Sequence, residues 1–181
     1  MIELSRVDSP LGTLTVAVGP HGLRALTLGD RMPMSLPSPA RETRPPAEIA
    51  DALAAYFAGD LRAIDAMDVD PEGTPFQRRV WAALRTIPAG STWSYAELAR
   101  VVGQPAATRA VGAANGKNPI ALVVPCHRVI ASDGTLGGYG GGLEMKRWLL
   151  RHERSWPAPA RSSTRSLFDE AGGPLPTCRM R

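Results

Sequence analysis

The chain has 181 residues, enough to bury a core as one domain or as two small ones. No stretch is long and apolar enough to span a bilayer, and the N-terminus lacks a signal-peptide pattern, so we expect a cytoplasmic protein. The two cysteines, Cys126 and Cys178, are far apart and suggest no disulfide framework. They also form no metal-ligand cluster with the three histidines, His21, His127 and His152. We therefore expect reduced thiols, no bound metal and no other cofactor.

Charge is unevenly distributed along the chain. Residues 1–70 carry six Arg and Lys against ten Asp and Glu, whereas residues 71–156 carry eleven against five. Basic surfaces attract phosphate backbones, so the second segment makes nucleic acid a candidate partner, with an ordinary solvated surface as the alternative. Residues 157–181 are rich in Pro, Ser and Arg, and we expect a disordered tail there.

Residues 1–70 have the pattern of a small strand-rich unit. Residues 13–18 and 23–28 alternate in type around a Gly-Pro-His-Gly turn, which predicts a hairpin. Residues 32–46 are rich in Pro, Ser and Arg and predict a loop. Residues 49–57 have helical spacing. Nothing in this unit has a catalytic pattern.

The segment 71–156 is predicted to be mostly helical. Thr74–Gln77 and Ser94–Glu97 are capping boxes, each of which starts a helix. The second helix breaks at Gly103-Gln104-Pro105, and a third helix is predicted over Ala106–Asn115. Two short helices around a tight turn predict a helix-turn-helix. The fold class is therefore expected to be α+β, with a strand-rich N-terminal unit and a helical C-terminal domain.

The third predicted helix is unusually rich in small side chains, and Arg109 is its one long probe. Small side chains allow a backbone to approach its partner closely, which suits sequence-independent binding in the minor groove of DNA. A plain helical hairpin inside a core is the alternative, and the pattern alone leaves both open. The residues expected to contact DNA are Arg109, Ala106, Ala110, Gly112 and Ala113.

The strongest chemical signal is Cys126 followed by His127. A thiolate is a strong nucleophile, and a neighbouring base is a usual way to produce it. The apolar run 120–124 predicts a strand that leads into a stiff turn at Pro125. Glu153 lies at the edge of an apolar helical stripe, so it could orient His127 as a third member of the set. The alternatives are that Glu153 is an exposed last-turn residue, or that the set belongs to a thiol hydrolase.

A glycine-rich segment follows, with six glycines and Tyr139 between residues 134 and 142. It predicts a mobile loop or one that another group approaches closely. No phosphate-binding motif fits its context.

Taken in order, these motifs resemble the O6-alkylguanine-DNA alkyltransferases, also called methylated-DNA–protein-cysteine methyltransferases. The resemblance runs from Thr74 to Glu153, and no single motif except Pro-Cys-His-Arg-Val is specific. The matching segments are Thr74–Gln77, Ser94-Tyr95, Ala107–Gly112, Asn118-Pro119, Pro125–Val129, Gly138-Tyr139 and Trp148–Leu150 ahead of Glu153.

The resemblance implies a monomeric repair protein that binds double-stranded DNA containing O6-alkylguanine. It would flip the damaged base and move the alkyl group irreversibly to its cysteine, once per molecule and without a cofactor. Cys126 would be the acceptor, His127 its water-mediated base, and Glu153 the group that polarises His127. Asn118 would hold the turn that carries the cysteine.

The resemblance also implies roles around the base. Tyr95 would help turn the nucleotide out and donate a hydrogen bond to the departing guanine, while Arg109 would fill the vacated stack. Tyr139 would wall the pocket, and the backbone at Cys126 and Val129 would recognise the exocyclic amine.

Two features limit or test the resemblance. Many relatives have serine where this chain has Gly140, so a backbone contact to O6 would survive here but a hydroxyl contact would not. A non-catalytic binder of alkylated DNA is the main alternative, although such relatives usually have tryptophan in place of the cysteine. A methyl-sensing regulator would need a further cysteine-rich zinc domain, for which this chain has neither the length nor the cysteines.

Overall fold

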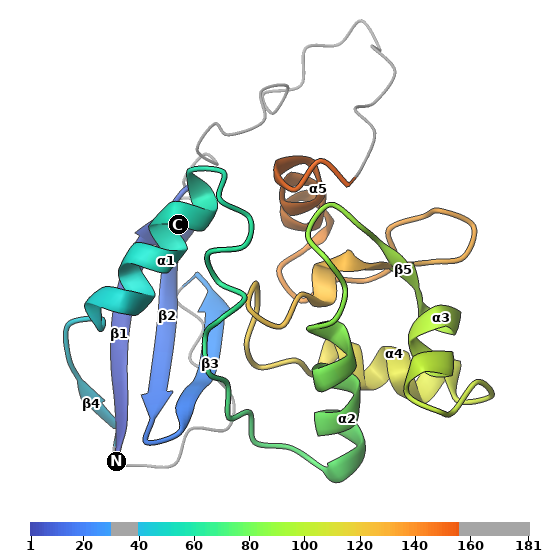
Figure 1. The fold of residues 1–181 in the computed structure, drawn as a ribbon, viewed down its shortest axis with the longest axis horizontal. Coiled ribbons are helices and arrows are strands. Elements are labelled where there is room, and N and C mark those ends of the chain that lie inside the picture. Colours follow the sequence, from blue (N-terminus) through green and yellow to red (C-terminus); the bar gives the residue numbers. More distant parts are fainter. Residues whose placement is uncertain (30–39, 156–181) are drawn as a thin grey trace, which may run out of the picture.

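A four-stranded sheet forms the N-terminal half of the fold (Figure 1). The computed structural model describes residues 1–29 and 40–155, so the predicted tail and Cys178 lie outside the described residues. The strand order is β3-β2-β1-β4, with β1–β2 and β2–β3 antiparallel and β1–β4 parallel. The strands are β1 (Ile2–Ser9), β2 (Gly12–Gly19), β3 (Gly22–Leu28) and β4 (Ala40–Glu42).

The predicted hairpin is thus confirmed, but the predicted loop 32–46 is partly wrong, because residues 40–42 form β4. This short strand pairs with β1 through Ile2 and Ala40, so backbone pairing at a sheet edge prevails over a Pro- and Ser-rich local composition. Residues 30–39 are outside the described residues.

Helices make up most of the C-terminal half, and one further helix lies against the sheet. Figure 1 shows α1 in front of the sheet, with α2, α3 and α4 grouped on the other side of the molecule. The expected α+β fold class is confirmed. The helices are α1 (Ala47–Phe57), α2 (Pro75–Leu84), α3 (Tyr95–Val101), α4 (Thr108–Gly116) and α5 (Leu143–His152), with a 3-10 turn η1 (Cys126–Arg128) and the paired strands β5 (Trp93–Ser94) and β6 (Val129–Ile130).

Both predicted capping boxes form. The Thr74 hydroxyl accepts a hydrogen bond from the Gln77 backbone at 3.2 Å, and the Gln77 side chain accepts one from the Thr74 backbone at 2.8 Å. The same reciprocal bonds join Ser94 and Glu97. These pairs satisfy amides that would otherwise lack partners in the first turns of α2 and α3.

The third predicted helix starts later than expected. The structure begins α4 at Thr108, and its N-cap, Ala107, makes no side-chain hydrogen bond. Ala106 therefore precedes the helix and lies in the turn between α3 and α4. The indole nitrogen of Trp81 on α2 donates to the Ala114 carbonyl at 2.9 Å, which fixes α4 against α2.

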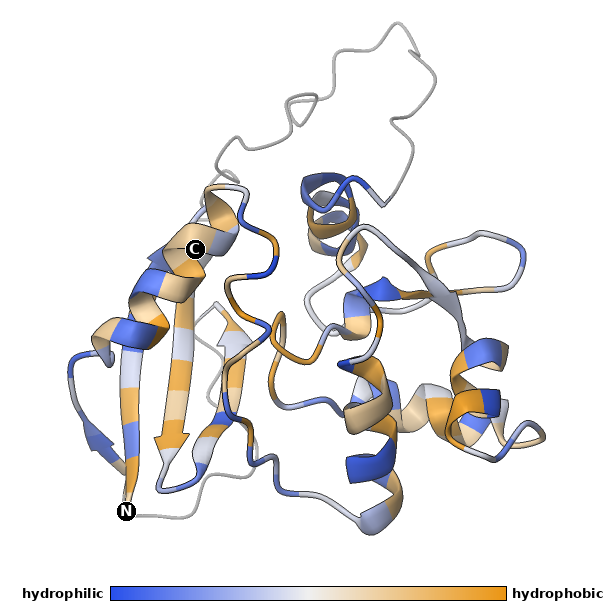
Figure 2. Ribbon diagram, viewed as in Figure 1, coloured by the Kyte–Doolittle hydropathy of each residue, from blue (hydrophilic) through white to orange (hydrophobic). Residues whose placement is uncertain are grey.

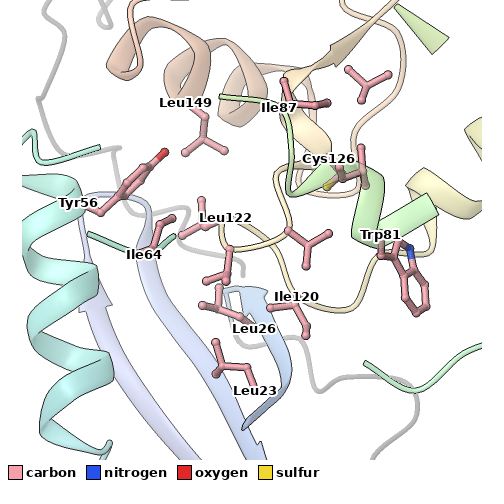
Figure 3. Close-up of a cluster of buried hydrophobic side chains, with 14 of the residues drawn as sticks. Leu23, Leu26, Tyr56, Ile64, Trp81, Ile87, Ile120, Leu122, Cys126 and Leu149 are labelled. Atoms are coloured by element: carbon pink, nitrogen blue, oxygen red, sulfur yellow. The ribbon is translucent and has the colours of Figure 1, made fainter. Parts of the chain in front are cut away.

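One hydrophobic core joins the sheet to the helices. Its cluster includes Leu26 of β3, Tyr56 of α1, Trp81 of α2 and Leu149 of α5 (Figure 3). Figure 2 shows both hydrophobic and hydrophilic residues on α1 and on α2. The buried residues of each helix lie on one apolar face, namely Ile49, Leu53 and Tyr56 on α1 and Val80, Trp81 and Leu84 on α2. The cluster contains residues from both sides of residue 70, so the two halves share one core. The division into two domains at that residue stays a prediction.

The apolar run 120–124 forms a turn, so its prediction as a strand is wrong. Only Ile120 makes a strand-like bridge, to Leu26 on the edge of β3. Leu26 donates to the Pro119 carbonyl at 2.9 Å and accepts from the Ala121 amide at 2.8 Å. Leu122 then adopts a positive φ of 68°, which a strand does not allow. The chain reverses here because side-chain hydrogen bonds from a neighbouring asparagine, described below, replace strand pairing.

Within residues 1–29 and 40–155, no helix has the length and apolar character needed to cross a bilayer.

The capping box of α2 generates a stability prediction. We expect Thr74→Ala to lower the free energy of unfolding by about 1 kcal/mol, because it removes an N-cap acceptor. Urea denaturation followed by circular dichroism measures this change. Thr74→Ser keeps the hydroxyl and is the matched control, and an equal loss in both variants would contradict the role of the cap.

Candidate active site

Asn118 folds the loop that leads to the cysteine. Its amide nitrogen donates to the Val124 carbonyl at 2.7 Å and to the Ile120 carbonyl at 3.3 Å, and its amide oxygen accepts from the Ile120 backbone at 3.0 Å. One side chain thus ties both ends of the turn. The backbone then enters η1, where Cys126 is buried.

Pairing between β5 and β6 brings Tyr95 to this site. Trp93 pairs with Val129, which directly follows η1, so α3 begins beside the cysteine turn. A Cβ atom added at Gly137 would lie 3.1 Å from the Tyr95 hydroxyl, and one added at Gly112 would lie 3.6 Å from its ring. Tyr95 therefore lies between α4 and the glycine-rich segment, and glycine at 137 leaves the room that the phenol needs.

A buried carboxylate organises the other side of the site. Oε1 of Glu153 accepts hydrogen bonds from His127 Nε2 at 3.0 Å, from the Tyr56 hydroxyl at 2.7 Å and from Arg128 Nη2 at 2.8 Å. Oε2 accepts from Arg128 Nε at 2.8 Å. Glu153 is 1 % exposed and His127 0 %, so the alternative of an exposed last-turn glutamate is wrong.

The remaining donors of this group are also accounted for. Arg128 Nη1 donates to the Ile87 carbonyl at 2.6 Å. Nδ1 of His127 is buried and makes no hydrogen bond to another described protein group. With Nε2 donating to Glu153, Nδ1 carries the lone pair and is the nitrogen able to accept a proton.

Sequence reasoning missed two members of this network, Tyr56 and Arg128. Arg128 stands in the Pro-Cys-His-Arg-Val motif, and a buried glutamate needs a charged partner, so this residue could have been found. Tyr56 lies 97 residues before Glu153, on a helix whose spacing marked it only as part of an apolar face.

The electrostatics keep Glu153 ionised. Burial alone would raise the pKa of its carboxyl, but the imidazole of His127 and the guanidinium of Arg128 outweigh burial and hold the pKa well below its ordinary value. Breaking such a buried charge pair costs about 3–5 kcal/mol.

At the nucleophile, burial prevails over the polar partners. It raises the pKa of the Cys126 thiol, although the Asn118 side chain and the nearby Lys146 partly offset this effect. Lys146, also missed in the sequence, is fully buried, and its ammonium donates to the carbonyls of Val129 and Leu136. Burial lowers the pKa of Lys146 to about 8. The resting sulfur is therefore a thiol that needs a base.

Two tyrosines lie close enough to Cys126 for a negative charge on its sulfur to affect them. Burial, and then the cysteine, raise the pKa of Tyr95 and raise the pKa of Tyr139 well above its ordinary value. The Tyr139 hydroxyl is buried without a hydrogen-bond partner among the described groups. Gly140, next to it, is exposed.

The residues expected to contact DNA fall on two sides of α4. Arg109, Ala110 and Ala113 are exposed on the helix, and Ala106 is exposed just before it. Gly112 is only partly exposed and faces the ring of Tyr95. The side chain of Arg109 is thus the long cation among the exposed alanines of this surface.

Across the part of the chain that the structure describes, no group of three or more His, Cys, Asp or Glu side chains could hold a metal ion.

The depressed pKa of Glu153 predicts how stability depends on pH. The folded protein keeps this carboxylate charged where the unfolded chain binds a proton, so its contribution is present above the ordinary pKa of 4.5 and is lost as pH falls. We expect the free energy of unfolding in urea to fall between about pH 5 and pH 2, and to fall less steeply in Glu153→Gln. Glu3→Gln, at an exposed position, is the control. Equal slopes for the wild type and Glu153→Gln would contradict the assignment.

Comparisons with known proteins identify the family. Residues 75–155 match the family model described as 6-O-methylguanine DNA methyltransferase, DNA binding domain. The methylated-DNA–protein-cysteine methyltransferase of Mycolicibacterium paratuberculosis is 52% identical over 157 residues, covering 85% of this chain and 93% of its own. The protein of that name from Salmonella typhimurium is 59% identical over 108 residues, and the chain spans 63% of its length.

A solved structure extends the likeness to three dimensions. The crystal structure of Mycobacterium tuberculosis OGT in complex with DNA has a TM-score of 0.72 and 45% identity, covering 84% of this chain and 93% of that one. Because it is 52% identical to the Mycolicibacterium paratuberculosis protein over 93% of that relative's length, the chain belongs to the methylated-DNA–protein-cysteine methyltransferase family.

Proposed function

We propose that this protein repairs DNA by moving an alkyl group from O6 of guanine to the sulfur of Cys126, irreversibly and once per molecule. The observation that carries the proposal is the set of three buried groups in series. Cys126 precedes His127 in η1, and Nε2 of His127 lies 3.0 Å from the Glu153 carboxylate. Relatives named for this reaction support the same reading.

The transfer balances with the groups present. The thiol proton of Cys126 passes to Nδ1 of His127 through a water, and the sulfur attacks the alkyl carbon. A sulfur–carbon bond forms while the carbon–O6 bond breaks, and the electron pair leaves with the guanine. The thioether product has no carbonyl for water to attack, so the protein does not regenerate.

Glu153 supports the proton transfer. Its carboxylate stabilises the imidazolium that forms on His127 and fixes the tautomer in which Nδ1 is free to accept a proton. Together with His127, Arg128 lowers the pKa of the Glu153 carboxyl, so the carboxylate stays ionised.

The tyrosines act on the leaving base. A phenol with a raised pKa retains its proton at neutral pH, so Tyr95 can donate a hydrogen bond to the guanine as negative charge develops on it. Tyr139 would form a wall of the pocket, and the backbone at Cys126 and Val129 would recognise the exocyclic amine. With Gly140 in place of serine, only backbone contacts to O6 are available at that position.

DNA would bind along the exposed side of α4. The relative from Mycobacterium tuberculosis has been solved in complex with DNA. The exposed alanines at 106, 110 and 113 would let the α4 backbone approach the minor groove, and Arg109 would enter the stack that the flipped base leaves. Double-stranded DNA containing O6-alkylguanine is thus the proposed partner, and the protein would act as a monomer.

A mass measurement tests the transfer. We expect incubation with a duplex that contains O6-methylguanine to replace the thiol hydrogen by one methyl group on the peptide that holds Cys126. The gain should stop at one methyl per molecule, and Cys126→Ser should abolish it while DNA affinity stays close to that of the wild type. Repeated turnover would indicate a hydrolase, and binding without a mass change would indicate a non-catalytic binder of alkylated DNA.

Arg109 gives a separate prediction. We expect Arg109→Ala to weaken DNA binding and slow transfer, each by about tenfold or more, because the variant loses a cation and the side chain that offsets the cost of base extrusion. Fluorescence anisotropy and single-turnover kinetics measure the two effects. Arg62→Ala removes an equal charge outside α3 and α4 and is the control. An equal loss in both variants would indicate a general charge effect.

A further inference from the structure

The N-terminal half supplies one hydrogen bond to the candidate active site. Tyr56, near the end of α1, is fully buried, and its hydroxyl donates to Oε1 of Glu153 at 2.7 Å. Figure 3 shows the ring of Tyr56 extending from α1, with its hydroxyl directed toward α5. The same oxygen accepts from His127 and Arg128, so three donors from two distant parts of the sequence meet on one atom.

The end of α1 is itself held in place by α5. Nε2 of His152 lies 2.8 Å from the Tyr56 carbonyl, and the Tyr56 and His152 rings meet edge to face with centroids 5.1 Å apart. His152 therefore holds the backbone of Tyr56, and Glu153, which follows His152 in the chain, accepts a hydrogen bond from its hydroxyl. This double contact leaves the hydroxyl little freedom to move away from Oε1.

A neutral donor on Oε1 has two consequences for His127. It restricts the position of the carboxylate, which sets the orientation of the imidazole through the 3.0 Å bond to Nε2. It also withdraws negative charge from Oε1, so the imidazolium is stabilised less strongly than it would be by a bare carboxylate.

We propose that Tyr56 is a positioning residue for the transfer reaction, which acts through Glu153 on His127 and makes the N-terminal half part of the reactive assembly. This inference rests on the proposed function of the same site. The titratable and charged groups that face Glu153 are Tyr56 from α1 and His127 and Arg128 from η1, with Tyr139 close enough for an electrostatic effect.

The test compares Tyr56→Phe with Phe57→Leu in the full chain. Tyr56→Phe removes one hydroxyl, whereas Phe57→Leu trims the same contact between α1 and α5, at the Trp148 and His152 rings, and leaves the hydrogen bonds of Glu153 in place. The measurements are affinity for a duplex that contains O6-methylguanine, the single-turnover rate at saturating duplex, and the dependence of that rate on pH.

We expect Tyr56→Phe to slow transfer by about tenfold, the order that one hydrogen bond to a charged group is worth, with unchanged DNA affinity. The acid limb of the profile, where the rate falls as pH falls, should move to higher pH in this variant. Without the Tyr56 hydrogen bond the Glu153 carboxylate carries more negative charge, which favours the protonated imidazole. Phe57→Leu should lower thermal stability and keep both the rate and the limb of the wild type.

Each outcome bears on a definite claim. A wild type that transfers no methyl group overturns the proposed function, and this inference with it. A wild type that transfers, with an unchanged rate and profile in Tyr56→Phe, overturns this inference alone, as does an equal effect in Phe57→Leu. Should Tyr56→Phe not fold, Tyr56→3-fluorotyrosine keeps the shape and strengthens the donor. Its acid limb should move to lower pH, and an unmoved limb would also overturn the inference.

Discussion

The buried carboxylate of Glu153 is the constraint on which the rest of the site depends. An ionised group in a protein interior is tolerated only when hydrogen bonds and opposite charge replace the water that it has lost. Here four hydrogen bonds do so, two of them from the single guanidinium of Arg128. Glu153 follows the last turn of α5, and its donors come from α1 and η1. These hydrogen bonds therefore fix α5, the cysteine turn and α1 of the N-terminal half relative to one another.

Burial acts to raise the pKa of both the Glu153 carboxyl and the Cys126 thiol, but their partners offset it to different extents. Glu153 has strong cationic partners and stays charged, whereas the pKa of Cys126 is raised because Asn118 and Lys146 compensate its burial only in part. A neutral thiol is a poor nucleophile toward stray electrophiles in solution. Activation in place by His127 would therefore confine reactivity to a substrate that is already seated.

Local sequence patterns predicted local structure well, but they did not predict the contacts between residues far apart in the sequence. The capping boxes at Thr74 and Ser94 were readable because their partners lie three residues away. The run 120–124 has the composition of a strand, but the Asn118 side chain donates two hydrogen bonds to its backbone and accepts one from it, which folds the run into a turn. The contact between His127 and Glu153 was predicted from the adjacency of Cys126 and His127 and from the position of Glu153 at the edge of an apolar stripe. The contact of the Tyr56 hydroxyl was not predicted, since no periodicity in α1 separates a tyrosine that fills space from one that donates.

The edge of β3 has a consequence for the position of the cysteine. Backbone hydrogen bonds between Leu26 and the 119–121 segment continue the sheet into the loop that precedes the cysteine, and Ile120 and Leu122 belong to the same apolar cluster as Leu26. The matched segment 75–155 thus holds Cys126, His127 and Glu153 but not a complete interior. A substitution in the strand-rich half that shifted β3 would therefore displace the loop that leads to Cys126, even with every motif of the matched segment unchanged.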